Sequence, residues 1–492
     1  MSYRTIRYFL GLILIILALL LSFPLLVSVV YGETLRFKLS FLFSMAIAGG
    51  LGFLLQCHKP KSLRLYAREG GIIVALGWLL LSFFGALPFV FSGDIPHLVD
   101  AYFETASGFT TTGASIVHSV DDLARSTLFW RSFTHFIGGM GFLVFTLAIV
   151  SNSGSDSVHL MKAEVPGPVF GKLVARLRTT AQILYGIYLA LTAILVVILL
   201  AFQVPFYDAL LLAFGTAGTG GFGIRDIGLS AYANPEAVEY ILGIFMLIFG
   251  VNFNLYYLIL IKHLKEVYQD EELRAYVAIV TVAIVAIFLN VLPQYQHWEP
   301  ALRNIFFTVS SIITTTGYST ANFDKWPMFS KMILLLLMFV GGCAGSTAGG
   351  LKVSRIVLYF KTFVAELRRG AHPNRIVILQ SGHRRIDADY VVSVSRYLIV
   401  YTLLFNAMVL ILTLDAENFL TAFSAVAATL NNIGPGFEIV GPTRNYASLN
   451  DLSKFVLSIG MIAGRLELYP ILVLFSPLQI TFTHLPFNRG EF

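Results

Sequence analysis

Two threonine–glycine strings are the residues in this sequence best suited to chemistry. TTTGAS occupies residues 110–115 and TTTGYS occupies residues 314–319. Glycine accepts backbone angles that a Cβ would penalise, so it can turn a peptide carbonyl inward. Carbonyl oxygens arranged in a ring can replace the water around a dehydrated cation. The strings therefore predict backbone coordination of a cation, provided that enough of them meet at one point.

Two further stretches follow the same spacing. In all four, a polar residue starts a short apolar run and a glycine follows 13 positions later. The stretches are DAYFETASGFTTTG (100–113), DALLLAFGTAGTGG (208–221), NIFFTVSSIITTTG (304–317) and TAFSAVAATLNNIG (421–434). As helices, such runs would extend only ~20 Å, short of a ~30 Å hydrocarbon core. We therefore expect four re-entrant or surface helices, each followed by a glycine loop.

The composition places these stretches in a membrane protein. The 492 residues are 57% hydrophobic and only 13% charged, whereas an ordinary soluble chain is roughly 25% charged. Ten continuous apolar segments are long enough to span a bilayer, and their lack of alternation excludes a β-barrel. They lie near residues 8–30, 38–56, 71–92, 130–151, 181–203, 237–261, 274–292, 328–350, 391–413 and 453–475. The first has too long an apolar run for a signal peptide and lacks a small-x-small cleavage site, so we expect it to be retained.

The distribution of charge predicts the orientation. Lysine and arginine gather in alternate loops, which all lie on one side if both termini are cytoplasmic. The opposite side carries acidic residues such as Asp94, Glu236 and Asp451, and the four short stretches fall there. This bias accounts for the net charge of +6 without a nucleic-acid partner. The two cysteines, Cys57 and Cys343, are far apart and predict neither a metal cluster nor a disulfide framework.

The four stretches divide the chain into repeats. Each is flanked by one full span on either side, and the first two spans stand outside the pattern. We expect an all-α polytopic membrane protein with four pseudo-symmetric span–pore-loop–span repeats around one ion pore, preceded by two extra N-terminal transmembrane helices. The predicted units are residues 1–69 for these two helices, then 70–178, 179–272, 273–390 and 391–492 for repeats one to four.

The candidate ion ligands form the walls of a selectivity filter. They are Thr111, Thr112, Gly113, Thr219, Gly220, Gly221, Thr315, Thr316, Gly317, Asn432, Ile433 and Gly434. The negative C-terminal ends of the short helices would favour a cation at the same point. No acidic residue stands beside the glycines, which favours a monovalent ion chosen by its hydration cost. One threonine–glycine string is equally well explained as a plain loop, but four at one spacing on one side of the membrane are not.

Together with GGFG (220–223), SAVAATLNNIGPG (424–436), GGCAGSTAGGLK (341–352) and GRLE (464–467), these strings resemble the Trk/Ktr/HKT superfamily of K⁺ transporters. The similarity covers essentially the whole chain and is greatest to the TrkH/TrkG-type bacterial uptake subunits. It implies a channel-like K⁺-translocating subunit in the bacterial cytoplasmic (inner) membrane, with K⁺ bound at the filter residues. It also implies a homodimer with one pore per protomer.

The sequence both matches and departs from the filter of the resembled family. Gly113 stands where certain Na⁺-selective plant relatives carry serine, which implies K⁺. Loop two carries Gly218 and Gly220 where a relative can have bulkier residues. Loop four has Asn432 and Ile433 in place of threonines. We therefore expect the fourfold geometry to be approximate.

The string GGCAGSTAGG interrupts the eighth span. It lacks the Gly-Lys-Ser/Thr of a phosphate loop and the Gly-x-Ser-x-Gly of a nucleophile elbow. Its small residues could pack helices closely, whereas the resemblance implies an intramembrane gate beneath the filter. The gate candidates are Gly341, Gly342, Gly345, Ser346, Thr347, Gly349, Gly350, Lys352 and Arg465. For Lys352, pairing with carbonyls, capping of a restarting helix and snorkelling all stay open.

Arg465 lies roughly midway along the last predicted span. An arginine there costs about 2.5–3.5 kcal/mol on insertion scales, so it should face the bundle interior or water. We favour a place in the conduit below the filter, where its charge would raise the barrier for K⁺. The alternative is an internal ion pair with another helix.

The basic segment from Lys361 to Arg385 is either an anchor on anionic lipid or a docking site for a regulatory subunit. The resemblance implies a cytosolic TrkA-type partner that binds NAD(H) or ATP/ADP. This chain has no Rossmann or Walker fingerprint, so we expect no cofactor on it and nucleotide control only through the partner. We do not expect an enzyme. The alternative function is a K⁺ symporter coupled to H⁺ or Na⁺ through Glu467 and Glu104.

Overall fold

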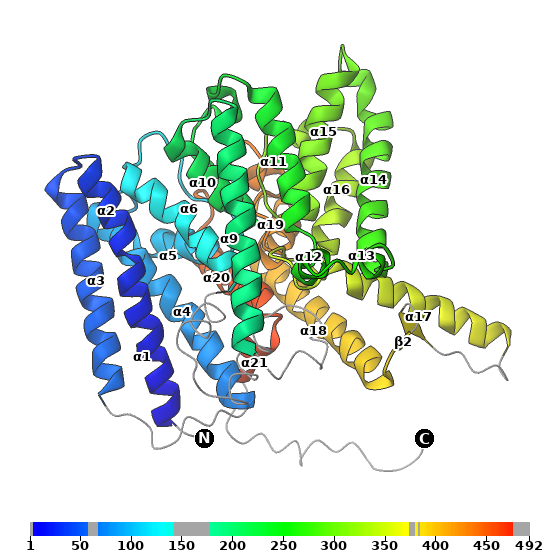
Figure 1. Cartoon of the computed structure of the whole chain (residues 1–492), viewed down its shortest axis with the longest axis horizontal. Coiled ribbons are helices and arrows are strands. Elements are labelled where there is room, and N and C mark those ends of the chain that lie inside the picture. Colours follow the sequence, from blue (N-terminus) through cyan, green and yellow to red (C-terminus); the bar gives the residue numbers. More distant parts are fainter. Residues whose placement is uncertain (1–2, 58–66, 142–176, 373–378, 382–383, 476–492) are drawn as a thin grey trace.

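The computed structural model describes residues 3–57, 67–141, 177–372, 379–381 and 384–475. Within them, the two-residue strands β1 (Gln380–Ser381) and β2 (Arg384–Arg385) are antiparallel partners, and the other regular elements are helices. Most long helices run side by side in one bundle (Figure 1). Six described helices are long and apolar enough to cross a membrane, or seven if one bent pair counts as a single span. The expected all-α polytopic class is confirmed.

The N-terminal helices form an edge of the bundle (Figure 1). They are α1 (Tyr3–Leu20), α2 (Ser22–Val30) and α3 (Leu35–Gln56). Where α1 crosses α3, a Cβ on Gly11 would lie 2.6 Å from the carbonyl oxygen of Gly52, and a Cβ on Gly52 would lie 2.8 Å from that of Gly11. Two small residues therefore let these backbones touch, as is usual where helices pack within a membrane.

The remaining helices fall into four consecutive groups. The first holds α4 (Ala67–Ser92), α5 (Leu98–Phe109) and α6 (Arg125–Gly139). The second holds α9 (Leu177–Ala201), α10 (Phe206–Ala217), α11 (Pro235–Phe249), α12 (Phe253–Leu260) and α13 (Leu264–Tyr268). The third holds α14 (Glu271–Val291), α15 (Trp298–Ile313), α16 (Met328–Val340) and α17 (Val353–Ala371). The fourth holds α18 (Ala388–Leu412), α19 (Phe419–Leu430), α20 (Asp451–Arg465) and α21 (Tyr469–Phe475). Short 3-10 turns occur at Gly228–Ala231, Leu292–Gln294, Phe323–Lys325 and Glu438–Val440.

The short helices α5, α10, α15 and α19 hold these groups together in a closed ring. Each packs against long helices of its own group and against the group before it: α10 on α6, α15 on α11, and α19 on α16. The ring closes because α5 packs on α20. The four groups thus surround a common centre, which is consistent with the fourfold repeat predicted from the sequence.

Side-chain caps explain where several helices begin. The side chain of Asn418 accepts a hydrogen bond from the backbone N–H of Thr421 (2.8 Å) at the start of α19. Asn450 does the same for Ser453 (2.8 Å) at the start of α20. Asparagine is a favoured N-cap because its side-chain oxygen satisfies an N–H that the helix leaves open. These local signals fix the register of the segments on both sides of the fourth loop.

Three of the predicted spans that lie wholly within the described residues are interrupted. Within 237–261, α11 and α12 meet at a bend of 90°. Within 328–350, α16 ends at Val340 and the glycine-rich string follows. Within 453–475, α20 ends at Arg465, and Glu467 and Leu468 have positive φ angles of 54° and 67° before α21 begins. Arg465 is therefore the last residue of a helix, and its predicted place midway along a continuous span is wrong.

Parts of the sequence predictions fall outside the described residues. Residues 142–151, the second half of the predicted fourth span, are among them. So are several basic residues of the loops used for orientation, namely Lys59, Lys61, Arg64, Lys162, Lys172, Arg176 and Arg375. The orientation and the boundaries of the five sequence units stay predictions.

The close crossing of α1 and α3 can be tested with one pair of variants. Gly52→Val should lower the free energy of unfolding by about 1–3 kcal/mol, the usual cost of overpacking, because its side chain would meet Gly11 and Ile15. Gly50→Val is the matched control, since nothing lies within 4 Å of its Cβ. Thermal unfolding of the detergent-purified variants measures the difference. Equal midpoints for the two variants would contradict the close contact.

Candidate ion-binding site

The four short helices end in the same way. Each stops four residues before its loop glycine. In the first, the N–H groups of Thr110, Thr111 and Thr112 donate to the carbonyls of Ala106 (2.9 Å), Gly108 (3.1 Å) and Ser107 (2.9 Å). The counterparts of all three bonds are present at α10, α15 and α19. This pattern is a Schellman helix ending, which requires a left-handed residue at its second step.

Each loop carries two left-handed residues at matching positions. The first is Thr111 (φ 56°), Thr219 (52°), Thr315 (55°) or Asn432 (57°). The second is Gly113 (φ 78°), Gly221 (74°), Gly317 (85°) or Gly434 (104°). A left-handed conformation is unfavourable for a β-branched residue such as threonine. Its recurrence in all four loops indicates that the shape of the loop itself is needed.

The loops also touch one another in a closed order. A Cβ on any of the four glycines would lie under 3.0 Å from a carbonyl oxygen of the next loop. Gly113 meets Gly220, Gly221 meets Thr316, Gly317 meets Ile433, and Gly434 meets Thr112. These carbonyls all belong to the residue immediately before a loop glycine. The loops therefore form one ring, and the absence of a side chain at each glycine is what allows the ring to close.

The ring opens onto a cavity of about 260 Å³. All four loop glycines line it, together with residues that follow each loop. Its charged lining residues are Arg225, Asp226 and Arg444, so the mouth is mixed in charge and differs from the acidic mouth that the loop charges suggested. The hydroxyl of Ser119 donates to Asp226 (2.7 Å) and lowers the pKa of that carboxyl below its usual value, so Asp226 stays ionised at mildly acidic pH.

A buried ion pair supports the first loop. Glu104 of α5 and Arg131 of α6 lie 2.8 Å apart, and both side chains are buried. Glu104 also accepts hydrogen bonds from the hydroxyl of Ser115 and the N–H of Ile116, both at 3.0 Å. Arg131 donates to the carbonyl of Gly223 (3.2 Å). Because a buried pair is tolerated when its remaining hydrogen bonds are met, Glu104 acts here as a scaffold that joins the segments after loops one and two.

His135 explains why loop two is rich in glycine. Its imidazole lies within hydrogen-bond distance of the carbonyl of Gly108 (2.8 Å) and accepts from the N–H of Phe222 (3.3 Å). A Cβ on Gly220 would collide with this ring, and a Cβ on Gly218 would collide with the backbone of His135. The departure of loop two from the threonine pattern is thus caused by a neighbouring helix.

Asn432 has a matching explanation in loop four. Its side-chain nitrogen donates to the hydroxyl of Thr112 (3.0 Å) and to the carbonyl of Met461 (2.9 Å). The hydroxyl of Tyr446 donates to the carbonyl of Gly434 (2.7 Å). The amide joins loop four to loop one and to α20, a reach that a threonine hydroxyl does not have.

The glycine-rich string is a hairpin loop between α16 and α17. Its neck is narrow: a Cβ on Gly341 would lie 2.8 Å from the Cα of Gly350, and a Cβ on Gly350 would lie 2.6 Å from the Cα of Gly341. The N–H of Leu351 donates to the carbonyl of Phe339 (3.0 Å), and that of Val353 to the carbonyl of Gly342 (3.0 Å). Gly341, Gly345, Gly350 and Lys352 have positive φ angles. The structure thus has a folded loop here, and the string does not continue the helix.

This intramembrane loop lies against the ring. The N–H of Gly349 donates to the hydroxyl of Thr315 (2.6 Å), and a Cβ on Gly349 would collide with the carbonyl of Asn431. Thr315 and Asn431 come before the loop glycines Gly317 and Gly434 in the sequence, and these two glycines line the cavity. The hydroxyl of Ser346 bonds within the loop, to the carbonyl of Cys343 (2.6 Å). The loop therefore lies next to the helix-proximal ends of the third and fourth glycine loops.

Two buried cations contact this loop through carbonyls. Arg465 donates to the carbonyls of Thr347 (2.8 Å), Gly138 (2.5 Å) and Gly139 (2.6 Å). Lys352 donates from Nζ to the carbonyl of Ala348, which is the carbonyl pairing that the sequence left open. Arg465 thus links the loop to the end of α6.

Comparison with known proteins identifies the family. The model of the TrkH family, described as cation transport protein, matches residues 34–482. This chain belongs to the TrkH family. It is 37% identical to the Trk system potassium uptake protein TrkH of Salmonella typhimurium over 97% of this chain and 99% of that protein. It is 32% identical to TrkG of Escherichia coli K12, over 96% and 98%. The crystal structure of the potassium transporter TrkH from Vibrio parahaemolyticus aligns with a TM-score of 0.87 at 32% identity, covering 97% and 99% of the two chains.

Several residues that shape the site of this TrkH-family chain were missed from sequence. They are Arg131, His135 and Tyr446. The available signal was a titratable or polar group inside or beside an apolar segment, which in a membrane protein marks a functional or structural partner by default. Their partners could not be named because they are distant in sequence: Arg131 contacts Glu104 and Gly223, and His135 contacts Gly108 and Phe222.

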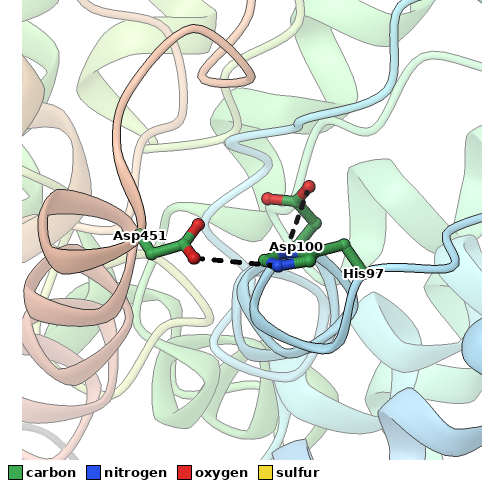
Figure 2. Close-up of side chains that lie close together, drawn as sticks. All are labelled: His97, Asp100 and Asp451. Atoms are coloured by element: carbon green, nitrogen blue, oxygen red, sulfur yellow. Dashed lines mark ion pairs between the residues drawn. The ribbon is translucent and has the colours of Figure 1, made fainter.

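A group outside the ring could be mistaken for a metal site. His97, Asp100 and Asp451 face one another at the starts of α5 and α20 (Figure 2). His97 lies 3.7 Å from each carboxylate. The ammonium group of Lys454 contacts the carboxylate of Asp100 at 2.6 Å. The more buried of the two carboxylates therefore already has a positively charged side chain as its partner. We interpret the group as an ion-pair cluster that joins the first and fourth repeats of the TrkH-family fold.

The ring predicts a sharp difference between two nearby glycines. Gly221→Ala should reduce cation uptake at least about tenfold. Its Cβ would strain the contact with the carbonyl of Thr316, and a rise of ~1.4 kcal/mol in the activation barrier for permeation slows the rate tenfold. Gly223→Ala should have little effect, because nothing lies within 4 Å of its Cβ. Uptake of ⁸⁶Rb⁺ into cells or vesicles with equal protein levels measures this. Similar losses in both variants would refute the ring contact at Gly221.

Proposed function

We propose that this chain is the K⁺-translocating subunit of a bacterial K⁺ uptake system. The observation that carries the proposal is the closed ring in which each loop glycine lies against a carbonyl of the next loop. The names of the similar Trk proteins support K⁺ as the ion. In this proposal, peptide oxygens of the ring take the place of the water around a dehydrated K⁺.

In the proposed pathway, K⁺ enters from the cavity and loses water at the ring. The carbonyls of the twelve filter residues, Thr111 to Gly113, Thr219 to Gly221, Thr315 to Gly317 and Asn432 to Gly434, replace that water. The C-terminal ends of α5, α10, α15 and α19 immediately precede these residues. Their partial negative charge favours a cation without binding it so tightly that it cannot leave.

We propose that the intramembrane loop of residues 341–352, together with Arg465, closes the inner end of this pathway. Its support is the seating of Gly349 against Thr315 and the bond from Arg465 to Thr347. A guanidinium beside the conduit would raise the energy of K⁺ there, since like charges repel strongly where water is scarce. Movement of the loop would then open the path.

The setting of the subunit is also a proposal. We place the chain in the bacterial inner membrane with both termini cytoplasmic, as a homodimer with one pore per protomer. A cytosolic TrkA-type subunit would bring NAD(H) or ATP/ADP control, because the sequence of this chain holds no nucleotide-binding fingerprint. The basic segment that starts at Lys361 would contact this partner or anionic lipid.

Coupled transport with H⁺ or Na⁺ ranks second. The two carboxylates that the sequence offered for coupling are both engaged: Glu104 pairs with Arg131, and Glu467 pairs with Arg355 at 2.7 Å. A carboxylate that holds a structural ion pair is poorly suited to bind and release a coupling ion, because leaving the pair would strand its buried partner charge. This favours simple permeation.

Selectivity tests the filter directly. Gly113→Ser and Gly317→Ser should each weaken discrimination of K⁺ over Na⁺, because a side chain at either position would displace the facing carbonyl. Reversal potentials of purified protein in bilayers, with K⁺ on one side and Na⁺ on the other, measure this, and Gly223→Ser is the control. Unaltered Na⁺ exclusion with full growth on micromolar K⁺ would contradict the filter. A wild-type reversal potential that moves with pH at fixed K⁺ would favour coupling.

Arg465 tests the gate. Arg465→Ala should raise K⁺ flux several-fold, since removal of one nearby charge and its bonds lowers the barrier in the conduit. Arg369→Ala removes an exposed arginine that pairs with Glu366 and should leave the flux unchanged. Rates of ⁸⁶Rb⁺ uptake by the reconstituted protein give the comparison. Unchanged flux in a folded Arg465→Ala variant would count against its role.

A further inference from the structure

Glu272 binds the intramembrane loop at two points. It is the second residue of α14. Its Oε1 accepts a hydrogen bond from the N–H of Ala344 (2.6 Å) and another from the N–H of Ser354 (3.0 Å). Ala344 lies in the first arm of the loop, and Ser354 lies in the first turn of α17. One carboxylate oxygen therefore joins the two ends of the segment that touches the ring.

Both bonds are of a kind that is costly to lose. The N–H groups in the first turn of a helix have no partner within the helix, and a carboxylate there also gains from the helix dipole. Hydrogen bonds to a charged acceptor are stronger than neutral ones. The segment between the two points contains Thr347 and Gly349, which contact Arg465 and Thr315. Holding its ends therefore holds the whole loop against the ring.

We propose that the Glu272 carboxylate is the latch that keeps the intramembrane loop in its closed position. The inference rests on the proposed gating role of that loop and adds the residue that positions it. Glu272 belongs to α14, which starts the third repeat, so the loop is latched to the scaffold and not to the moving segment itself.

Further contacts connect the region around Glu272 to α17. The neighbouring Glu271 pairs with Lys361 of α17 at 2.5 Å, and Lys361 also donates to the carbonyl of Gln380 (2.7 Å). Arg355 of α17 pairs with Glu467. From the loop, α17 extends away from the bundle (Figure 1). A displacement of α17 would pull Ser354 from Glu272 and release one end of the loop, so this helix is the lever through which a cytosolic signal would reach the latch.

The chain contains its own probe for this latch. Cys343 precedes Ala344 in the loop and is buried, whereas Cys57 is exposed. In a Cys57→Ser background of the full chain, the rate of maleimide labelling therefore reports how often the loop opens. Glu272→Ala should speed this labelling about tenfold or more, the effect expected when charge-assisted hydrogen bonds are lost. It should also raise ⁸⁶Rb⁺ uptake by the reconstituted chain several-fold.

Two variants separate the latch from a general loss of structure. Glu272→Gln keeps an oxygen acceptor of the same reach but loses the charge, so it should partly restore slow labelling, to a rate between those of Glu272→Ala and the wild type. Glu266→Ala removes an exposed side chain that pairs with His263, outside the loop and α17, and should label at close to the wild-type rate. If Glu272→Ala does not fold, Glu272→Asp, whose side chain is one methylene shorter, decides the question in the same assay.

The outcomes are distinct. Faster labelling in Glu272→Ala with partial restoration in Glu272→Gln supports the latch. Unchanged labelling in the folded Glu272→Ala variant, or equal acceleration in Glu266→Ala, overturns it. Faster labelling with unchanged ⁸⁶Rb⁺ uptake supports the latch and overturns the gating role of the loop, so failure of the proposed function is visible separately.

Discussion

A peptide group that leaves a helix inside a membrane must find another partner, and this requirement governs the centre of the protein. Non-helical backbone at membrane depth persists only against protein or a water-filled cavity. Here four chain segments leave their helices at equivalent points and meet one another, with a glycine of each against a carbonyl of the next. The long helices, the short helices and their caps all serve to bring these segments to that ring.

The four loops of the ring share one backbone geometry, but different side chains hold each loop in place. Loop one depends on the buried pair of Glu104 and Arg131, and loop two on the imidazole of His135. In loop three, the hydroxyl of Ser311 donates to the carbonyl of Tyr318 (2.7 Å). Loop four uses the amide of Asn432. Because the shared requirement concerns backbone angles and close approach, different side chains can meet it in each repeat, which explains why the loops diverge while their spacing does not.

What could be predicted from sequence follows from how local each signal is. The short helices were predictable because their length and the glycine 13 positions on are properties of one segment, and each helix ends where that spacing requires. The break between α11 and α12 was not. Residues 237–261 form one apolar run in which Gly250 follows the end of α11 and Asn252 precedes the start of α12, where its side chain caps the N–H of Asn254 (3.0 Å). The place of Arg465 was wrong for a related reason. Hydropathy does not register the positive φ angles that end α20, which accompany local bonds from the N–H groups of Glu467 and Leu468 to the carbonyls of Gly464 and Ala463.

The intramembrane loop differs from the rest of the bundle in what holds it. Its residues are mostly glycine, alanine and small polar side chains, so it offers little apolar area to bury. Instead it is bound by directional contacts with several helices. The backbone N–H of Cys343 donates to the carbonyl of Gly250 (2.9 Å). The hydroxyl of Thr347 donates to the carbonyl of Phe249 (3.2 Å). A segment held this way can be released by exchanging a few hydrogen bonds, without opening a cavity in a packed core, and such segments belong to the low-stability end of a protein. The bend between α11 and α12 is part of this arrangement, since it frees the two carbonyls that the loop uses. The broken helix and the small-residue loop are therefore structurally linked: the first exposes backbone acceptors, and the second occupies them.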